Sequence, residues 1–136
     1  MTFAIDHLGI AVRSLREAAA MYEKIGVSIT PPETVAAEKV RLVMVPLANA
    51  RLELLEATSE DSVIAKFIAT HGEGLHHVCL RVPDLKAAIE KLQREGVRLL
   101  SQQPRVGAGG HRYVFVHPSS AGGVLLELVD SAQDSC

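Results

Sequence analysis

The sequence contains an internal repeat of a strand-like segment, and this repeat constrains the fold more than any other feature. Residues 4–15 (AIDHLGIAVRSL) recur at lower fidelity as residues 74–85 (GLHHVCLRVPDL), with His77 in the place of His7. Both segments alternate in period two, which is typical of a half-buried strand. Each segment then reaches a small polar residue that opens a helical pattern. The chain is therefore expected to contain two copies of one folding unit.

A second, shorter repeat adds a glutamate to each copy. Residues 51–55 (RLELL) resemble residues 125–129 (LLELV), which places Glu127 on Glu53. The His and the Glu are 53 − 7 = 46 residues apart in the first copy and 127 − 77 = 50 residues apart in the second. Two equivalent His and two equivalent Glu are what a duplicated metal site requires. The alternative is a structural repeat whose polar residues face solvent, which leaves the matching residue types unexplained.

Composition limits the classes of function that this chain can serve. Its 136 residues suit one domain, or two small modules that share a core, and 48% of them are hydrophobic. The formal net charge of −2 gives no basic excess for nucleic acid or an anionic membrane. Aromatic residues make up only 4% and Trp is absent, so a platform for base stacking is not expected.

Targeting signals and cysteine usage bear on the cellular setting. The sequence shows no signal-peptide pattern and no apolar run long enough to span a bilayer. Cys79 lies in a strand pattern and Cys136 at the terminus, which is neither a disulfide framework nor a metal-spaced pair. These features fit a reducing, cytoplasmic location, without a membrane partner.

Turn and capping signals divide the chain into two βαβββ modules. The sequence predicts a single α+β domain over residues 1–136, with modules at about 4–58 and 74–130 joined by a short helix at about 60–71. Ser14 opens the first helix with a capping box and Asp84 opens the second. The expected strands are 3–12, 40–47, a segment around Glu53, a segment around His77 within 74–85, 98–101, 113–117 and 124–129, with a flexible glycine-rich turn at 106–110.

Strand periodicity separates the candidate ligands from their neighbours. His7 shares a face with Gly9 and Ala11, whose small side chains leave room for something to approach. His76 lies beside His77 in an alternating strand, so it should face the opposite surface and pack against a helix. His77 is therefore the expected ligand of the two.

Several motifs together resemble the vicinal oxygen chelate superfamily and, within it, the methylmalonyl-CoA epimerases. The His-Glu-His-Glu pattern on duplicated βαβββ modules is specific only to the superfamily. The helix that begins at Glu60-Asp61-Ser62 and the glycine-rich loop before the last hairpin favour the epimerases. The matching stretches are residues 5–12, 60–68, 72–78, 104–110, 117–120 and 123–128, which extend over nearly the whole chain except the tail.

The resemblance implies a metal site and a set of partners. It places the metal ligands on His7, Glu53, His77 and Glu127, in a curved mixed sheet that surrounds the ion. Imidazole and carboxylate ligands suit Co²⁺, which we expect first, or Mn²⁺, Ni²⁺ or Zn²⁺. The implied substrate is an acyl-CoA, and the implied assembly is a homodimer.

The implied reaction is inversion at C2 of methylmalonyl-CoA by proton removal and return through an enolate. A divalent ion would stabilise the enolate, and inversion requires an acid/base group on each face. Glu127 matches the family's base. Some relatives have a second Glu on the third strand, where this chain has Leu42, so Glu53 is the next candidate and Glu38 a weaker one.

Two other functions are compatible with parts of this pattern. A glyoxalase I-type lyase acting on a glutathione hemithioacetal can use the same His-Glu-His-Glu set, but the Glu60-Asp61-Ser62 helix argues against it. A binding module of the same fold, which sequesters drugs or metals, usually loses some of the ligands, and here all four are present.

Overall fold

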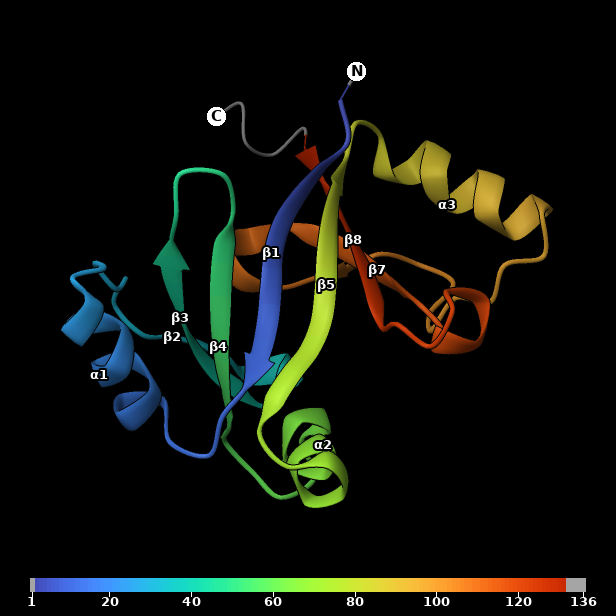
Figure 1. Ribbon diagram of the computed structural model, residues 1–136. Helices are drawn as coiled ribbons and strands as arrows, with labels where there is room; N and C mark the ends of the chain where they lie inside the picture. The colour runs from blue at the N-terminus through green and yellow to red at the C-terminus, as the bar shows by residue number, and fades with distance from the viewer. Residues whose placement is uncertain (1, 132–136) are drawn as a thin grey trace. The chain divides into compact units, whose positions relative to one another are not determined.

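The computed structural model describes residues 2–131 (Figure 1), and the three predicted helices are present in the predicted order. Residue 136, the second cysteine, lies outside the described residues. The strands are β1 (Ala4–Ala11), β2 (Glu33–Val35), β3 (Val40–Pro46), β4 (Arg51–Ala57), β5 (Gly74–Val82), β6 (Arg105–Val106), β7 (Arg112–Val116) and β8 (Leu126–Asp130). The helices are α1 (Leu15–Ile25), α2 (Val63–His71) and α3 (Leu85–Arg94), with short 3-10 turns η1 (Ala36–Glu38), η2 (Ala108–Gly110) and η3 (Pro118–Ser120).

The chain forms two compact units. We call residues 7–76 the N-terminal unit, and residues 2–6 with 77–131 the C-terminal unit. In the N-terminal unit β1 runs parallel to β4, and β4, β3 and β2 follow as antiparallel neighbours. In the C-terminal unit β5 runs parallel to β8, and β8, β7 and β6 follow in the same way. The predicted fold class, α+β with two βαβββ modules and mixed strand pairing, is confirmed.

One face of each ladder is covered by a helix and forms an apolar core. In the N-terminal unit α1 packs against β3 and β4, and the core there consists of Val12, Leu15, Val43, Val45 and Leu54. In the C-terminal unit α3 packs against β8, and the core consists of Val82, Leu85, Ile89, Val114, Val116 and Leu128. Burial of these side chains supplies the main driving force for each unit. The other face of each ladder is left for the polar residues of the repeat.

Both long helices of the repeat begin at the predicted caps. Ser14 Oγ accepts a hydrogen bond from the Glu17 N–H, and an Asp84 carboxylate oxygen accepts one from the Ala87 N–H. Each bond satisfies one of the N–H groups that the first helical turn leaves open. Helix α1 ends at Gly26, whose φ of 104° is the left-handed conformation that glycine tolerates best.

Helix α2 follows the first βαβββ unit and packs against β4. Its N-cap, Ser62, is only 1% exposed and accepts a hydrogen bond from the Ile64 N–H. Just before this cap, the Asp61 carboxylate accepts hydrogen bonds from Lys39 and Ser59. The Lys39 ammonium in particular holds the pKa of Asp61 down at about 2, against an ordinary value of 3.8.

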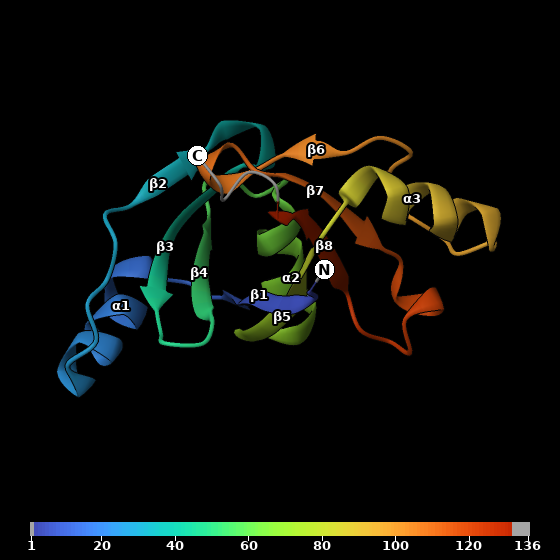
Figure 2. The same cartoon turned by 90° about the horizontal axis from the view of Figure 1, so that it is seen from above.

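Two predicted features of the sheet were wrong, and both involve edge strands. Residues 98–101 were expected to form a strand, but only Leu99 makes a single bridge, to Val116. The partner of β7 is instead β6, which includes Val106, a residue expected in a flexible turn. The short strand β2 was not located in advance, since Pro31 and Pro32 suggested only a loop. Figure 2 shows both short strands beside their partners, β2 next to β3 and β6 next to β7.

These errors share a physical cause. Strands of two or three residues contain too few positions for a period-two pattern to be recognised. Their pairing is decided by the neighbouring strand that offers free hydrogen-bonding groups.

Within residues 2–131, no helix has both the length and the apolar character that crossing a membrane requires.

Candidate metal centre

The N-terminal unit brings His7 and Glu53 together on the ladder face opposite α1. His7 Nε2 lies 3.3 Å from Glu53 Oε1, and the two side chains are only 7% and 8% exposed. Glu53 lies directly across from Gly9 on β1 and from Met44 on β3. Because paired residues share a face of a sheet, His7, Gly9, Met44 and Glu53 all project from the same side.

The C-terminal unit brings His77 and Glu127 together in the same manner. His77 Nε2 lies 3.1 Å from Glu127 Oε1, with the side chains 5% and 11% exposed. Glu127 lies across from Cys79 on β5 and from Phe115 on β7. The Phe115 ring meets the His77 ring edge-on, with their centroids 5.6 Å apart.

The two pairs are built by one register rule. In each unit the glutamate lies opposite the residue two positions after the histidine, Gly9 in one case and Cys79 in the other. This holds although the sequence separations of His and Glu differ by four residues, so the extra residues are absorbed in the connections. The repeat is therefore a repeat of geometry, and it places equivalent atoms, Nε2 and Oε1, face to face in both units.

The spacing within each pair fits joint ligation of a metal ion. Two ligands about 2.1 Å from an ion and at right angles to each other lie about 3.0 Å apart. The observed separations of 3.3 Å and 3.1 Å are close to this value. Neutral imidazole and carboxylate together suit borderline divalent ions. Burial also disfavours an isolated carboxylate, so a cation near each pair would offset the cost of desolvation.

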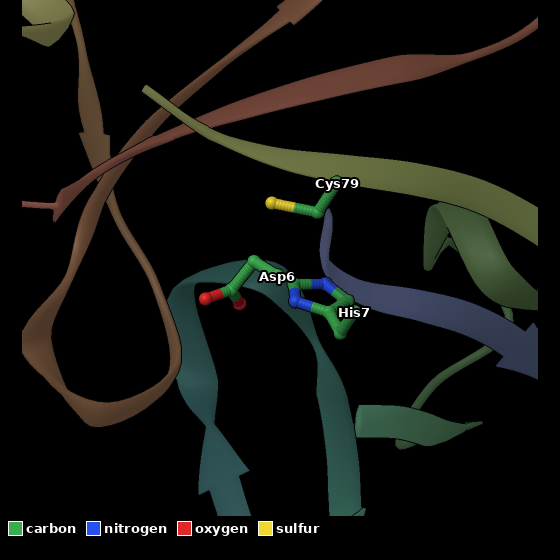
Figure 3. Close-up of side chains that lie close together, drawn as sticks. All are labelled: Asp6, His7 and Cys79. Atoms are coloured by element: carbon green, nitrogen blue, oxygen red, sulfur yellow. The ribbon is translucent and has the colours of Figure 1, made fainter. Parts of the chain in front are cut away.

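Other metal-binding residue types near the start of β1 are accounted for differently. Figure 3 shows Asp6 and His7 projecting from consecutive positions of β1, and Cys79 projecting from β5. Asp6 is 7% exposed and lies 3.5 Å from Arg81 Nη1, so a guanidinium already balances its charge. Cys79 is fully buried, and its thiol points to the Leu80 carbonyl oxygen at 3.9 Å. The pairing of Arg81 with Asp6 was not predicted from the sequence.

The third strand of the N-terminal unit has no acid at the position where some relatives have one. Leu42 is 3% exposed, shares the face of Glu53, and lies directly across from Glu33 on β2. On β1 to β4, Glu33 and Glu53 are the carboxylates whose register places them on this face. Glu33 was not singled out from the sequence because β2 was not recognised. Glu38 lies outside the ladder, in η1, and is half-buried.

The glycine-rich segment before β7 is more ordered than the expected flexible turn. A Cβ atom at Gly107 would lie 3.0 Å from Cε1 of Tyr113, so the ring would have to shift by a few tenths of an ångström to make room for any side chain there. Tyr113 is 6% exposed and meets Phe115 edge-on at a centroid distance of 5.5 Å. Gly107 therefore permits the aromatic packing that extends to His77.

Comparison with protein families gives a match to one superfamily. Residues 6–115 match the family model described as the Glyoxalase/Bleomycin resistance protein/Dioxygenase superfamily. This range includes the first three candidate ligands and extends over more than half of the chain.

Individual relatives and a solved structure are similar over almost the full length. The chain is 36% identical to the ethylmalonyl-CoA/methylmalonyl-CoA epimerase of Cereibacter sphaeroides, over 91% of this chain and 95% of that protein. It is 37% identical to the human mitochondrial methylmalonyl-CoA epimerase, over 91% of this chain and 72% of that protein. A methylmalonyl-CoA epimerase solved in complex with methylmalonyl-CoA and NH4+ superposes with a TM-score of 0.91 at 36% identity, covering 97% of this chain and 96% of that one.

Proposed function

We propose a mechanism from the premise that this chain belongs to the glyoxalase/bleomycin resistance protein/dioxygenase superfamily. Within that superfamily the chain is an isomerase that interconverts the two C2 epimers of methylmalonyl-CoA. The observation that carries the mechanism is the shared register of the two His-Glu pairs, which gives the chain two equivalent sets of ligand atoms. The near full-length similarity to epimerases selects the reaction from those known for the superfamily.

The first element of the proposal is a single divalent metal ion. His7, Glu53, His77 and Glu127 would hold it, and we propose Co²⁺, with Mn²⁺, Ni²⁺ or Zn²⁺ as substitutes. When bound, the ion supplies positive charge for the negative charge that develops on the substrate oxygens as the C2 proton leaves. Support comes from the burial of all four side chains and from the N···O separations within each pair.

The second element is a pair of acid/base residues. Glu127 accepts the C2 proton from one epimer, and a second carboxyl group, protonated at the start of the turnover, donates its proton to the opposite face of the planar intermediate. In the reverse direction the two groups exchange roles, so atoms and charge balance in both directions. We assign the second role to Glu53, the carboxylate of the N-terminal unit that is buried beside His7.

Two other carboxylates compete with Glu53 for the second role. Glu33 projects from the same ladder face and lies opposite Leu42, which occupies the place of the acid in some relatives. Glu38 is close in sequence to the same strand. Glu53 is preferred because its oxygen is already 3.3 Å from a candidate metal ligand, whereas Glu33 is on an exposed edge strand.

The proposal extends to partners and location. The substrate is a small acyl-CoA molecule, and we expect a homodimer working in the cytoplasm. Phe3 and Ile5 are 67% and 48% exposed, which offers apolar surface that a second copy could cover. Sedimentation of the purified chain at micromolar concentration should show a dimer, and a monomer at that concentration would contradict this part of the proposal.

The direct test follows the C2 proton. Methylmalonyl-CoA is incubated with the enzyme in D₂O, and NMR monitors loss of the C2 proton signal, with and without a metal chelator. We expect exchange and inversion together, both abolished by the chelator and restored by Co²⁺. A glutathione hemithioacetal serves as the control substrate and should not react. Turnover of the hemithioacetal without exchange at C2 would contradict the epimerase function.

A further inference from the structure

The short linker that joins α2 to β5 is held to the first unit by specific contacts. We define the linker as residues 72–76, between the end of α2 and the first ligand of the C-terminal unit, His77. Gly72 and Gly74 have φ angles of 80° and 150°, which glycine adopts with least strain. These glycines set the turn, but they do not fix its position, because glycine is free to adopt many conformations.

Glu73 supplies the fixed point in this segment. Its Oε2 accepts a hydrogen bond of 2.6 Å from the backbone N–H of Arg13, in the turn between β1 and α1. Its Oε1 also lies 3.8 Å from Nη1 of the Arg13 guanidinium. A hydrogen bond to a charged acceptor is roughly twice as strong as one between neutral groups. One carboxylate thus grips both the backbone and the side chain of Arg13.

The far end of the linker is packed against α2. The His76 ring meets the Phe67 ring edge-on at a centroid distance of 4.9 Å, and Phe67 stacks on His71 at 4.7 Å. This agrees with the expected helix-packing role of His76. The chain is therefore held at Glu73, just before β5 begins, and at His76, the residue of β5 that precedes His77.

The geometry points to Glu73 as a positioning residue for the metal centre. We propose that its grip on Arg13 fixes the path of the linker and so the presentation of His77, four residues later. Glu73 contacts neither metal nor substrate in this scheme and acts through the backbone that leads to a ligand. The inference rests on the proposed function, since it assumes that His77 is a metal ligand.

The internal repeat supports a role that is specific to this linker. Arg13 corresponds to Pro83 in the second copy, in the turn between β5 and α3. Proline has no backbone N–H, so the turn in the second copy cannot make the same contact. The second copy therefore lacks the backbone donor that Glu73 uses in the first copy.

The high solvent exposure of the Glu73–Arg13 pair allows a positioning role to be distinguished from a contribution to global stability. The Glu73 and Arg13 side chains are 47% and 64% exposed, and ion pairs this exposed contribute little to global stability. Loss of the Glu73 carboxylate should therefore leave the free energy of unfolding nearly unchanged. A change confined to metal affinity would show that the contact acts on the ligand strand.

The experiment measures metal affinity and global stability in the same variants. Apo protein is titrated with Co²⁺, urea unfolding is recorded, and hydrogen exchange is followed at the Arg13 amide. Glu73→Ala should weaken Co²⁺ binding about tenfold, the lower end for groups that orient metal ligands indirectly. Glu73→Gln should stay close to wild type, because its amide oxygen can still accept the Arg13 N–H. Glu95→Ala is the matched control, since Glu95 is an exposed partner of Lys91 at 3.5 Å on another helix.

The outcomes separate this inference from the function on which it rests. Tenfold weaker Co²⁺ binding in Glu73→Ala, with unchanged unfolding, faster exchange at Arg13 and rescue by Glu73→Gln, supports the positioning role. Unchanged Co²⁺ affinity in Glu73→Ala, or an equal fall in stability and affinity, overturns it. If the wild-type chain binds none of Co²⁺, Mn²⁺, Ni²⁺ and Zn²⁺, the proposed metal centre itself fails and the inference fails with it.

Discussion

The two units present the same pair of candidate ligand atoms in different surroundings. In each, a histidine and a glutamate on parallel strands follow one register, with Nε2 and Oε1 3.3 Å and 3.1 Å apart. The residue opposite the glutamate differs, however: Gly9 in the N-terminal unit and Cys79 in the C-terminal unit. The antiparallel neighbours differ too, with Met44 beside Glu53 and Phe115 beside Glu127.

This difference suggests that the two His-Glu pairs have different roles, a division of labour between the units. The His77 ring is supported edge-on by Phe115, which in turn packs against Tyr113, while Cys79 is fully buried beneath them. Next to Glu53, by contrast, Gly9 contributes no side chain. We propose that these contacts hold the C-terminal pair as a fixed anchor, whereas the N-terminal pair leaves space for a substrate group.

The units also differ in the tethers around them. Residues 7–76 contain two surface contacts that flank α2, Lys39 with Asp61 just before the helix and Arg13 with Glu73 just after it. The described residues 77–131 have no helix that corresponds to α2. The N-terminal unit therefore contains the connection between the copies as well as its share of the ligands.

The largest expected effect comes from removing the proton acceptor of each unit in turn. Glu127→Gln keeps an oxygen ligand and loses the base, so epimerisation should fall by about 10²–10⁴-fold while Co²⁺ stays bound. Glu53→Gln should abolish inversion to a similar degree. Proton exchange in D₂O should then survive from one epimer only, because Glu127 still serves one face. NMR on each separate epimer measures both rates.

The same variants can contradict the assignment of Glu53 as the second acid/base residue. Symmetric, near-normal exchange and inversion in Glu53→Gln would show that this residue is a ligand only. The second base would then be sought at Glu33 or Glu38, with Glu33→Gln and Glu38→Gln tested against each other. Leu42→Glu would add a carboxylate directly across from Glu33. Recovery of inversion by that substitution in Glu33→Gln would locate the second base on this edge of the ladder.

Exchanging the residue types at the matching positions Gly9 and Cys79 tests whether the N-terminal pair leaves space for substrate while the C-terminal pair is held rigidly. Gly9→Cys places a side chain beside Glu53, so kcat/KM should fall about tenfold or more with bound metal retained, because the substrate is misplaced. Cys79→Gly removes a fully buried side chain from a strand, so the free energy of unfolding should drop by about 2 kcal/mol. Steady-state kinetics and urea unfolding measure the two effects. Equal behaviour of the two variants in both assays would contradict the division of labour.

The smallest expected effect concerns the tether beside α2. The pKa of Asp61 is lowered from 3.8 to about 2, chiefly by the Lys39 ammonium, so ionised Asp61 favours the folded state. That contribution is complete above about pH 4 and is lost as the pH falls toward 2. NMR titration of the carboxyl group should give a midpoint near 2, rising toward 3.8 in Lys39→Met. A wild-type midpoint already near 3.8 would show that the Lys39 contact does not lower the pKa of Asp61 and does not stabilise the fold.

Much of the candidate site could be predicted from sequence because its residues lie in long, repeated strands. Alternation over eight or more positions places His7 and His77, and alignment of the copies pairs each histidine with a glutamate. The capping residues Ser14 and Asp84 were likewise identified, since they act on N–H groups only a few residues away. Signals of this kind are local or repeated, so they can be recognised in the sequence without knowledge of the fold.

The remaining features depend on contacts between distant segments. Glu73 and Arg13 are 60 residues apart, and no local pattern marks them as partners. Asp6 and Arg81 are also far apart in the sequence, so the ion pair that balances the buried Asp6 carboxylate has no local signal. Strand β2 is three residues long, so its pairing with β3, which gives Glu33 its place, emerged only from the structure.

Metal content of single histidine variants tests the central claim most directly, namely that two equivalent pairs share one ion. Co²⁺ bound per chain is measured by elemental analysis in wild type, His7→Ala, His77→Ala and His76→Ala. We expect one ion per chain in wild type and loss of that ion in both His7→Ala and His77→Ala. His76→Ala should retain the ion, because the His76 ring packs on Phe67. Two ions per wild-type chain, or loss in His76→Ala with retention in His77→Ala, would contradict it.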